Sequence, residues 1–275
     1  MTYEKLILDE ERALYGVTGA TVRSCLFAGD ADGESALKET DGLSVQNCEF
    51  RLRYPMWHMT NSKVTDCTLT DTCRAALWYC DSVSIKNSSL GGIKALRECR
   101  NVTVEDCDTV STEFGWFCEN VNLSGGTLSG EYPFLKTRDL SLEDLTLNGK
   151  YSFQYVENAL IRNCTLNTKD AFWHAKNVQV FDSFVKGEYL AWYSENVTFT
   201  RCKIVGTQPL CYCKNLTLID CEMIDCDLSF EKSEVVCSVT GAIESVKNPI
   251  SGSITADSIG QIILDTPTEC EIKTR

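Results

Sequence analysis

The chain has 275 residues, a formal net charge of −13 and 43% hydrophobic residues. This negative charge disfavours nucleic acid and anionic membranes as partners, and it repels acidic polysaccharides unless local basic residues receive them. No apolar run approaches membrane-spanning length, and no opening stretch resembles a signal peptide, so we expect a cytoplasmic location.

Residues 1–18 are expected to cap the fold and to open its first repeat. Tyr3–Leu8 has the composition of a strand that covers an open edge. Glu11–Tyr15 carries the pattern that starts the aromatic part of each later repeat. Residues 28–35, AGDADGES, are predicted to form a turn-rich insertion.

A repeat of about 19 residues runs through residues 19–230. The segments FWHAKNVQVFDSFV (172–185) and AWYSENVTFTRCKI (191–204) align without a gap at an offset of 19 residues. Each repeat has a position filled mostly by Asn, followed three residues later by an aliphatic or aromatic residue and six residues later by a small residue or Cys. The Asn position holds Asn101, Asn120, Asp139, Asn158, Asn177, Asn196 and Asn215. Units this short bury their apolar side only by stacking, which indicates a solenoid.

The repeat has the periodicity of β-strands. Apolar residues such as Val102 and Val104 lie two apart with polar residues between them, and no segment shows a long helical spacing. The L-x-x-L-x-L pattern of leucine-rich repeats is absent. We therefore predict an all-β, single-stranded, right-handed parallel β-helix of about 11–12 coils, which forms one domain over residues 1–275.

The pattern loosens after Met223. Val235–Ile243 and Ile254–Leu264 still have the composition of strands. We expect residues 231–275 to form degenerate coils and a C-terminal cap, after regular coils over residues 19–230.

The 16 cysteines fall at repeated positions and are expected in the core. Seven share the small-residue position, namely Cys25, Cys48, Cys67, Cys107, Cys164, Cys202 and Cys221, and four share another, namely Cys80, Cys99, Cys118 and Cys213. Cys211 and Cys213 lack the second pair that a structural zinc site requires. We predict no metal site and no cofactor.

Aromatic residues recur at neighbouring positions of the repeat. All five tryptophans lie four residues before the Asn position, at Trp57, Trp78, Trp116, Trp173 and Trp192. The next position carries both histidines and several tyrosines, and a third position four residues earlier carries further tyrosines. Because neighbouring side chains of a strand point to opposite faces, only one of the first two positions faces outward. The charges favour the Tyr/His position, and we expect the third position, which includes Asp170, to face outward with it.

An exposed aromatic row with interspersed charges suits a saccharide. The predicted substrate-binding residues are His58, Tyr79, Tyr155, Tyr193, Tyr212, Tyr151, Tyr189, Trp173 and Trp192. Two alternatives stay open: the aromatics only stabilise neighbouring coils, or the row binds a protein partner in a non-catalytic solenoid.

The sequence leaves open whether the protein is an enzyme. Glycoside hydrolysis requires two carboxyl groups about 5–9.5 Å apart, and no two acids occupy the same position of adjacent coils. Glu113 stacks against Lys94 in the repeat, which indicates an ion pair. The candidate catalytic residues are Asp170, His174, Lys94, Arg97, Glu98 and Glu113.

Several segments also resemble a known family. ERALYG (Glu11–Gly16), RYPMWH (Arg53–His58), RAALWY (Arg74–Tyr79), KDAFWH (Lys169–His174) and ADSIGQII (Ala256–Ile263) are similar to a bacterial family of uncharacterised proteins grouped with the pectin-lyase-like right-handed β-helices. The resemblance covers nearly the whole chain. It implies the β-helix fold, and it transfers no catalytic residue to this sequence.

Overall fold

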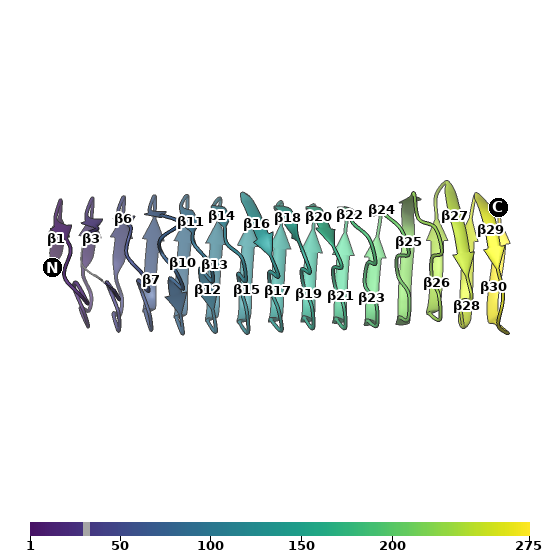
Figure 1. Cartoon of the computed structure of the whole chain (residues 1–275), viewed down its shortest axis with the longest axis horizontal. Helices are drawn as coiled ribbons and strands as arrows, with labels where there is room; N and C mark the ends of the chain where they lie inside the picture. Colours follow the sequence, from purple (N-terminus) through teal and green to yellow (C-terminus); the bar gives the residue numbers. More distant parts are fainter. Residues whose placement is uncertain (30–33) are drawn as a thin grey trace. The chain divides into compact units, whose positions relative to one another are not determined.

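The computed structural model describes residues 1–29 and 34–275, and the chain divides into two compact units, residues 1–141 and 142–275. Each unit is a right-handed parallel β-helix in which the strands of successive coils lie side by side (Figure 1). The boundary between the units falls within β17 (Arg138–Glu143). The predicted fold class is confirmed, but the described residues form about 14 turns instead of the predicted 11–12 coils. The single domain stays a prediction.

Unit 1 builds each coil from a first strand, a second strand and a third side. The first strands are β1 (Thr2–Glu4), β3 (Thr21–Arg23), β5 (Ser44–Gln46), β7 (Thr60–Thr65), β10 (Asp81–Lys86), β13 (Arg100–Glu105) and β15 (Glu119–Ser124). The second strands are β2 (Ile7–Leu8), β4 (Leu26–Phe27), β6 (Glu49–Phe50), β8 (Thr68–Leu69), β11 (Ser89–Gly91), β14 (Asp108–Val110) and β16 (Thr127–Glu131). Short strands occupy the third side of two coils, at β9 (Leu77–Trp78) and β12 (Leu96–Arg97).

Unit 2 continues the same plan to the end of the chain. Its strands are β18 (Thr146–Lys150), β19 (Glu157–Arg162), β20 (Thr165–Lys169), β21 (Lys176–Phe181), β22 (Phe184–Lys186), β23 (Glu195–Thr200), β24 (Lys203–Val205), β25 (Lys214–Ile224), β26 (Glu234–Val239), β27 (Ala242–Lys247), β28 (Ser251–Ala256), β29 (Ser258–Ile263) and β30 (Glu269–Thr274). β26, β28 and β30 pair in parallel, so coils persist through the segment predicted as degenerate, and regular pairing reaches Thr274.

The strand register reproduces the repeat seen in the sequence. In unit 2, Glu157 is the direct partner of Lys176, Lys176 of Glu195, and Glu195 of Lys214, so each step is one 19-residue repeat. Residues at the same position of successive coils therefore form a ladder of side chains, and parallel strands are about 4.8 Å apart.

The third side of the coil departs from strand geometry. In unit 2 its residues alternate between ordinary and positive φ, as at Asp170 (52°), Phe172 (60°) and His174 (56°). Hydrogen bonds to both neighbouring coils hold this backbone: Phe172 N donates to Ser152 O at 2.9 Å and His174 N to Trp192 O at 3.0 Å. A left-handed residue with a side chain costs about 1 kcal/mol or more, so these bonds offset a real strain.

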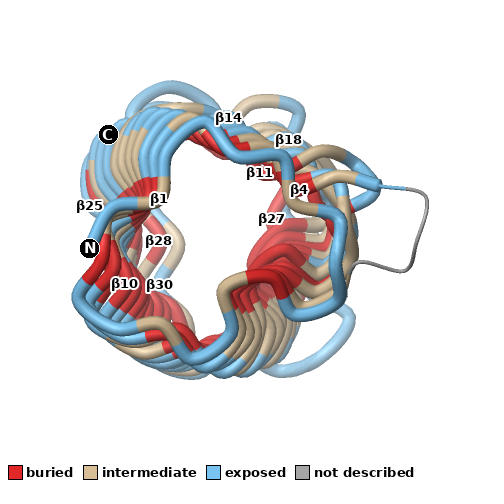
Figure 2. Tube along the Cα trace, turned by 90° about the vertical axis from the view of Figure 1, so that its left-hand side faces the viewer, coloured by how far each residue is buried: buried red, intermediate tan, exposed pale blue. Residues whose placement is uncertain are grey.

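The core lies inside the coils. Buried residues line the inner side of the tube in Figure 2, and the largest of them on the third side of unit 2 are Phe153, Phe172 and Phe230. The rings of Phe153 and Phe172 stack with centroids 4.5 Å apart. The phenylalanines of this ladder point into the core, where strict strand alternation would have placed the tryptophans.

Thiols and hydroxyls close the corner between the first and second strands. Asn47, with φ of 50°, turns the chain, and the amide of Cys48 that follows it donates to Cys67 Sγ at 3.4 Å. The Cys67 thiol in turn donates to Thr65 O at 3.2 Å. Ser183 does the same in unit 2, because its hydroxyl accepts from Cys164 N at 3.0 Å and donates to Phe181 O at 2.7 Å. In these coils the corner residue is a small side chain that both accepts and donates a hydrogen bond.

All 16 cysteines are free, and all are buried except Cys270, which is half-buried. Burial raises the pKa of Cys213 to about 12 and that of Cys226 to about 12. These thiols stay protonated at neutral pH, as their donor role requires. The predicted core location is confirmed, but the corner cysteines also bind backbone.

Residues 30–33 of the predicted insertion lie outside the described residues. In the described part of the chain, no helix is long and apolar enough to cross a membrane. No cluster of three or more His, Cys, Asp or Glu side chains in residues 1–29 and 34–275 is arranged to hold a metal ion, and the absence of a metal site stays a prediction.

The corner bonds give a direct stability test. Ser183→Ala removes the acceptor of the buried Cys164 amide, so we expect the free energy of unfolding to fall by about 1–3 kcal/mol. Ser183→Cys supplies the thiol that other coils carry and should cost less. Urea unfolding of both variants checks this, and equal losses would show that the corner only requires small volume.

Candidate functional site

Unit 2 carries a continuous stack of aromatic rings in which Tyr155 and Tyr193 are exposed and His174 and Tyr212 are half-buried. Tyr155, His174, Tyr193 and Tyr212 lie one above another, with centroids 4.9, 5.1 and 4.8 Å apart and interplanar angles of 9°, 11° and 12°. Tyr155 is 45% and Tyr193 48% exposed. The prediction that the Tyr/His position faces outward is confirmed for these coils. We call these four residues the aromatic stack.

The tryptophans also reach the surface, which strict alternation excluded. Trp173 and Trp192 are half-buried and stack with centroids 5.6 Å apart. Their indole N–H groups donate to Tyr189 O and Gln208 O, both at 2.8 Å. The alternation fails because left-handed residues precede and follow each tryptophan, so the inward position falls one residue earlier, at Phe172 in one of these coils.

Stacking determines which part of each ring a ligand can touch. The two faces of His174 and of Tyr193 are covered by the rings above and below. A sugar ring therefore cannot lie flat on them, and the stack presents ring edges, phenol hydroxyls and an imidazole edge instead. The aromatic row is a series of polar contacts about 5 Å apart, set by the strand spacing.

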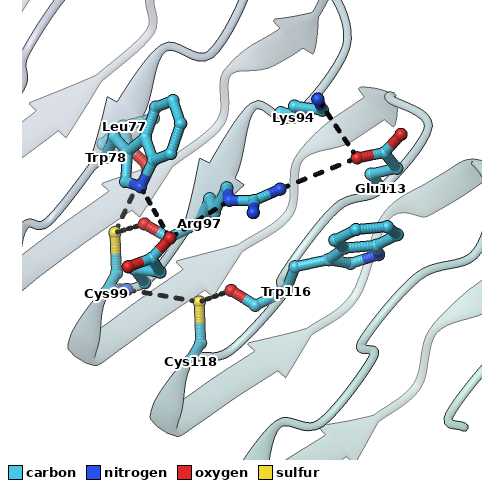
Figure 3. Close-up of polar contacts among 9 residues, drawn as sticks. Leu77, Trp78, Lys94, Arg97, Cys99, Glu113, Trp116 and Cys118 are labelled. Atoms are coloured by element: carbon cyan, nitrogen blue, oxygen red, sulfur yellow. Dashed lines mark hydrogen bonds and ion pairs between the residues drawn. The ribbon is translucent and has the colours of Figure 1, made fainter.

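In unit 1 the corresponding residues form separate pairs. His58 and Tyr79 stack at 5.0 Å, and Trp57 and Trp78 meet edge to face at 5.0 Å. Arg97 occupies the next tryptophan position, and its guanidinium extends between Trp78 and Trp116, 5.1 and 5.2 Å from their ring centroids (Figure 3).

Arg97, Lys94, Glu98 and Glu113 form one ion-pair network in unit 1. Lys94 Nζ lies 3.4 Å from Glu113 Oε2, which confirms the predicted ion pair, and Arg97 contacts Glu98 at 3.3 Å and Glu113 at 3.7 Å. Glu98 Oε1 also accepts from Trp78 Nε1 at 3.2 Å. Arg97 is only 18% exposed, so its charge is committed to this network, and a structural role fits the geometry. As catalytic candidates these residues stay a prediction.

Asp170 is the buried acid of unit 2. Although its position in the repeat was expected to face outward, the residue is 5% exposed. Its carboxylate has no hydrogen-bond partner in the described part of the chain, and burial raises the pKa of Asp170. Asp170 N donates to Glu188 O at 2.9 Å, so two acids lie on adjacent coils at positions offset by one residue. The sequence comparison missed this pair because it considered identical positions only.

A groove of about 630 Å³ crosses several coils of unit 2. Its lining residues are Gly149, Asn167, Thr168, Lys169, Lys186, Gly187, Glu188, Val205, Gly206, Thr207 and Asp225. Lys169 Nζ and Glu188 Oε2 pair at 2.8 Å across adjacent coils. Lys186 and Asp225 are exposed, and neither has an ion-pair partner in the described residues. We call this surface the groove of unit 2.

Glycines form much of the groove floor. A Cβ at Gly187 would lie 2.0 Å from Thr168 O, and one at Gly206 would lie 2.3 Å from Gly187 O. Side chains are therefore excluded by the backbone of the preceding coil, which leaves the surface hollow. A signal for this ladder was present in the sequence, because Gly92, Gly130, Gly149, Gly187 and Gly206 are separated by 19 or 38 residues.

The same ladder produces a smaller hollow of about 370 Å³ in unit 1. Its walls include Ile93 and Val110, which are exposed, together with Ser111, Thr112 and Asp71. Its described lining contains no Lys or Arg. The two hollows therefore differ in chemistry although they share a repeat position.

In unit 2 the groove joins the aromatic side. Lys169, on the groove wall, places its Nζ 5.6 Å from the ring centroid of Tyr189. Tyr189 contacts Trp192 edge to face at 5.2 Å, and Trp192 contacts Tyr212 of the aromatic stack at 5.4 Å. Groove, tyrosine and stack therefore form one continuous surface over the same coils.

The family comparison agrees with the resemblance seen in the sequence. A family model described as "Protein of unknown function (DUF3737)" matches residues 1–275. The chain belongs to this family. No curated protein matches the sequence.

Solved structures with similar coils share little sequence with the chain. A double mutant of the periplasmic alginate epimerase AlgG is 11% identical, with a TM-score of 0.35 over 94% of this chain and 78% of that one. The A-module of the Azotobacter vinelandii mannuronan C-5 epimerase AlgE6 is 10% identical, with a TM-score of 0.32 over 95% and 92% of the two chains. The tailspike of E. coli bacteriophage HK620 is 8% identical, with a TM-score of 0.36 over 93% and 62%. Similarity this low transfers no ligand to this chain.

Asp170 should make stability depend on pH. Burial favours its protonated form, so the folded chain binds this proton more tightly than the unfolded chain, and stability is lost as pH rises from the ordinary aspartate range through the raised pKa. We expect Asp170→Asn to be more stable than the wild type at neutral pH, with the advantage disappearing below about pH 4.

The urea midpoints of wild type and Asp170→Asn, measured at neutral pH and below about pH 4, test this effect. Asp225→Asn, at an exposed carboxylate of unit 2, is the matched control and should leave the midpoint unchanged. An Asp170→Asn protein that is less stable than the wild type at neutral pH would show that the charged carboxylate is favoured in the fold.

Proposed function

We propose that the protein binds an oligosaccharide in the groove of unit 2. The observation that carries the proposal is the continuity of this groove with the aromatic side through Lys169, Tyr189 and Trp192. An elongated hollow of about 630 Å³ has the size of a small-molecule site. It extends across stacked coils and therefore suits an extended ligand.

The lining has the chemistry of a sugar-binding surface. Asn167 and Thr207, which are half-buried, supply an amide and a hydroxyl for sugar hydroxyl groups. Of the two lysines in the groove lining, Lys169 is paired with Glu188, whereas Lys186 has no ion-pair partner in the described residues. Lys186 is therefore available to an acidic substituent such as a carboxylate. The positive charge of Lys186 would locally offset the repulsion between an acidic saccharide and a protein of net charge −13.

The aromatic stack contributes polar edges. Because neighbouring rings cover the faces of His174 and Tyr193, recognition there depends on hydroxyl and imidazole groups. Trp192, the last tryptophan of its ladder, links these edges to the groove.

Asp170 and Glu188 connect binding to a chemical step. Burial raises the pKa of Asp170, which is the direction that general acid catalysis of glycoside cleavage requires. Product analysis on any saccharide that binds separates cleavage from binding alone.

The first test measures binding to a panel of acidic and neutral oligosaccharides, with and without Ca²⁺, by thermal melting and calorimetry. A ligand of the native state raises the melting temperature. For an acidic ligand we expect Lys186→Ala to weaken binding about tenfold or more. Lys176→Ala, an exposed lysine outside the groove lining, is the matched control.

Two variants of Tyr193 distinguish binding through the phenol hydroxyl from binding through the aromatic ring. If the hydroxyl is what the ligand meets, Tyr193→Phe weakens saccharide binding by about as much as Tyr193→Ala, roughly three- to tenfold. Wild-type affinity in Tyr193→Phe combined with loss in Tyr193→Ala would mean that the ligand uses the ring itself.

A flat panel would overturn the saccharide proposal. The alternative, a non-catalytic solenoid that binds a protein partner, would then be supported by a protein that binds the same surface. Binding of that protein should be lost in Trp192→Ala and should persist in excess sugar.

A further inference from the structure

The last strand of unit 2 has one unpaired edge. Among the described residues β30 pairs only with β28. Glu269 N donates to Ile250 O at 2.8 Å and Arg275 N to Ala256 O at 3.0 Å, so these amides point to the preceding coil. Successive amides of a strand alternate in direction, and those of Ile272 and Thr274 therefore point away from it.

The core of this terminal coil is also uncovered. Ile254 and Ala256 of β28 are fully buried, whereas Ile272, the direct partner of Ile254, is only half-buried. Ile259 and Ile263 of β29 are half-buried as well. An apolar coil end with an open strand edge is a template for a further strand.

Charges on β30 identify which strand fits. The outward residues of β30 are Glu269, Glu271 and Lys273, and Arg275 follows directly after the strand. These are two acids followed by two bases, placed symmetrically about Ile272. In an antiparallel pair of two such strands centred on Ile272, Glu269 faces Arg275 and Glu271 faces Lys273, each twice. This gives four opposite-charge pairs and no like-charge pair.

Neighbouring registers are worse. Two neighbouring registers also pair the strands through the outward amides, one centred on Glu271 and one centred on Lys273. In the first register Glu271 faces Glu271 of the second copy, and in the second register Lys273 faces Lys273 of the second copy. Like charges directly opposite one another destabilise a pair of strands. The charge pattern therefore selects one register.

We propose that β30 is the interface of a two-fold homodimer, in which two copies of the chain pair antiparallel through this edge about Ile272. The interface is isologous, as in most homodimers, and it covers the open coil end. Ile272 meets its own copy at the two-fold axis.

Dimerisation exchanges local contacts for contacts with the second copy. In the single chain, Glu271 and Lys273 pair at 2.6 Å, Arg275 pairs with Asp257 at 3.2 Å, and Thr268 Oγ1 accepts from Cys270 N at 3.0 Å. Both ion pairs are exposed, and exposed pairs contribute little, so their exchange costs little.

Head-to-tail stacking on β1 of another copy is the competing arrangement. In ladder register it sets Lys273 opposite Glu4, a single opposite-charge pair, and Glu4 is already held by Arg23 at 2.9 Å. This arrangement would also continue into filaments.

Sedimentation equilibrium of the full chain, at low and high salt, tests the dimer. We expect a species of twice the 30.7 kDa chain mass that weakens with salt. Lys273→Glu should raise the dimer dissociation constant about tenfold or more, because it turns two attractive pairs into repulsive ones. The double swap Glu271→Lys with Lys273→Glu should restore the wild-type value.

Two further variants complete the test, with circular dichroism to verify folding. Thr274→Pro removes an outward amide that the chain itself does not use and should dissociate the dimer. Glu4→Lys should leave the dimer unchanged. A wild-type monomer at every concentration, a dimer that persists in Lys273→Glu, a double swap that fails to restore it, or dissociation in Glu4→Lys would each overturn the proposal.

Discussion

Backbone hydrogen bonding between coils in one fixed register is the constraint on which the structure depends. Direct partners such as Glu157, Lys176 and Glu195 hold every position of the repeat in line. Because the bonds also continue through the third side, where Phe172 and His174 bind opposite neighbours, even left-handed residues are tolerated there. Corner side chains such as Ser183 complete the bonding where the two strands meet.

The same register creates the surface that we propose as a binding site. It places the rings of the aromatic stack one strand spacing apart and so hides their faces. It also brings each coil so close to the one before that positions such as Gly187 and Gly206 accept no side chain, and the groove of unit 2 is the result. One geometric rule therefore yields both a polar aromatic edge and a hollow beside it.

Much of the fold followed from the sequence because a ladder position depends only on the repeat length. The 19-residue step, the core cysteines and the Glu113–Lys94 pair were all predictable from spacing. Side-chain direction on the third side was not, because left-handed φ values at residues such as Phe172 and His174 break the period of two. That is why tryptophans expected inside lie at the surface and Asp170 lies inside. The glycine ladder could have been found from its spacing, whereas the proximity of Asp170 and Glu188 required the register.

The most direct test of the account is amide hydrogen exchange with and without a saccharide that binds. If the groove of unit 2 is the site, protection should concentrate in peptides that contain Lys169, Lys186 and Gly206, with a smaller effect at Tyr193. Protection confined to unit 1, or spread evenly over the coils, would contradict the assignment of the ligand to this groove.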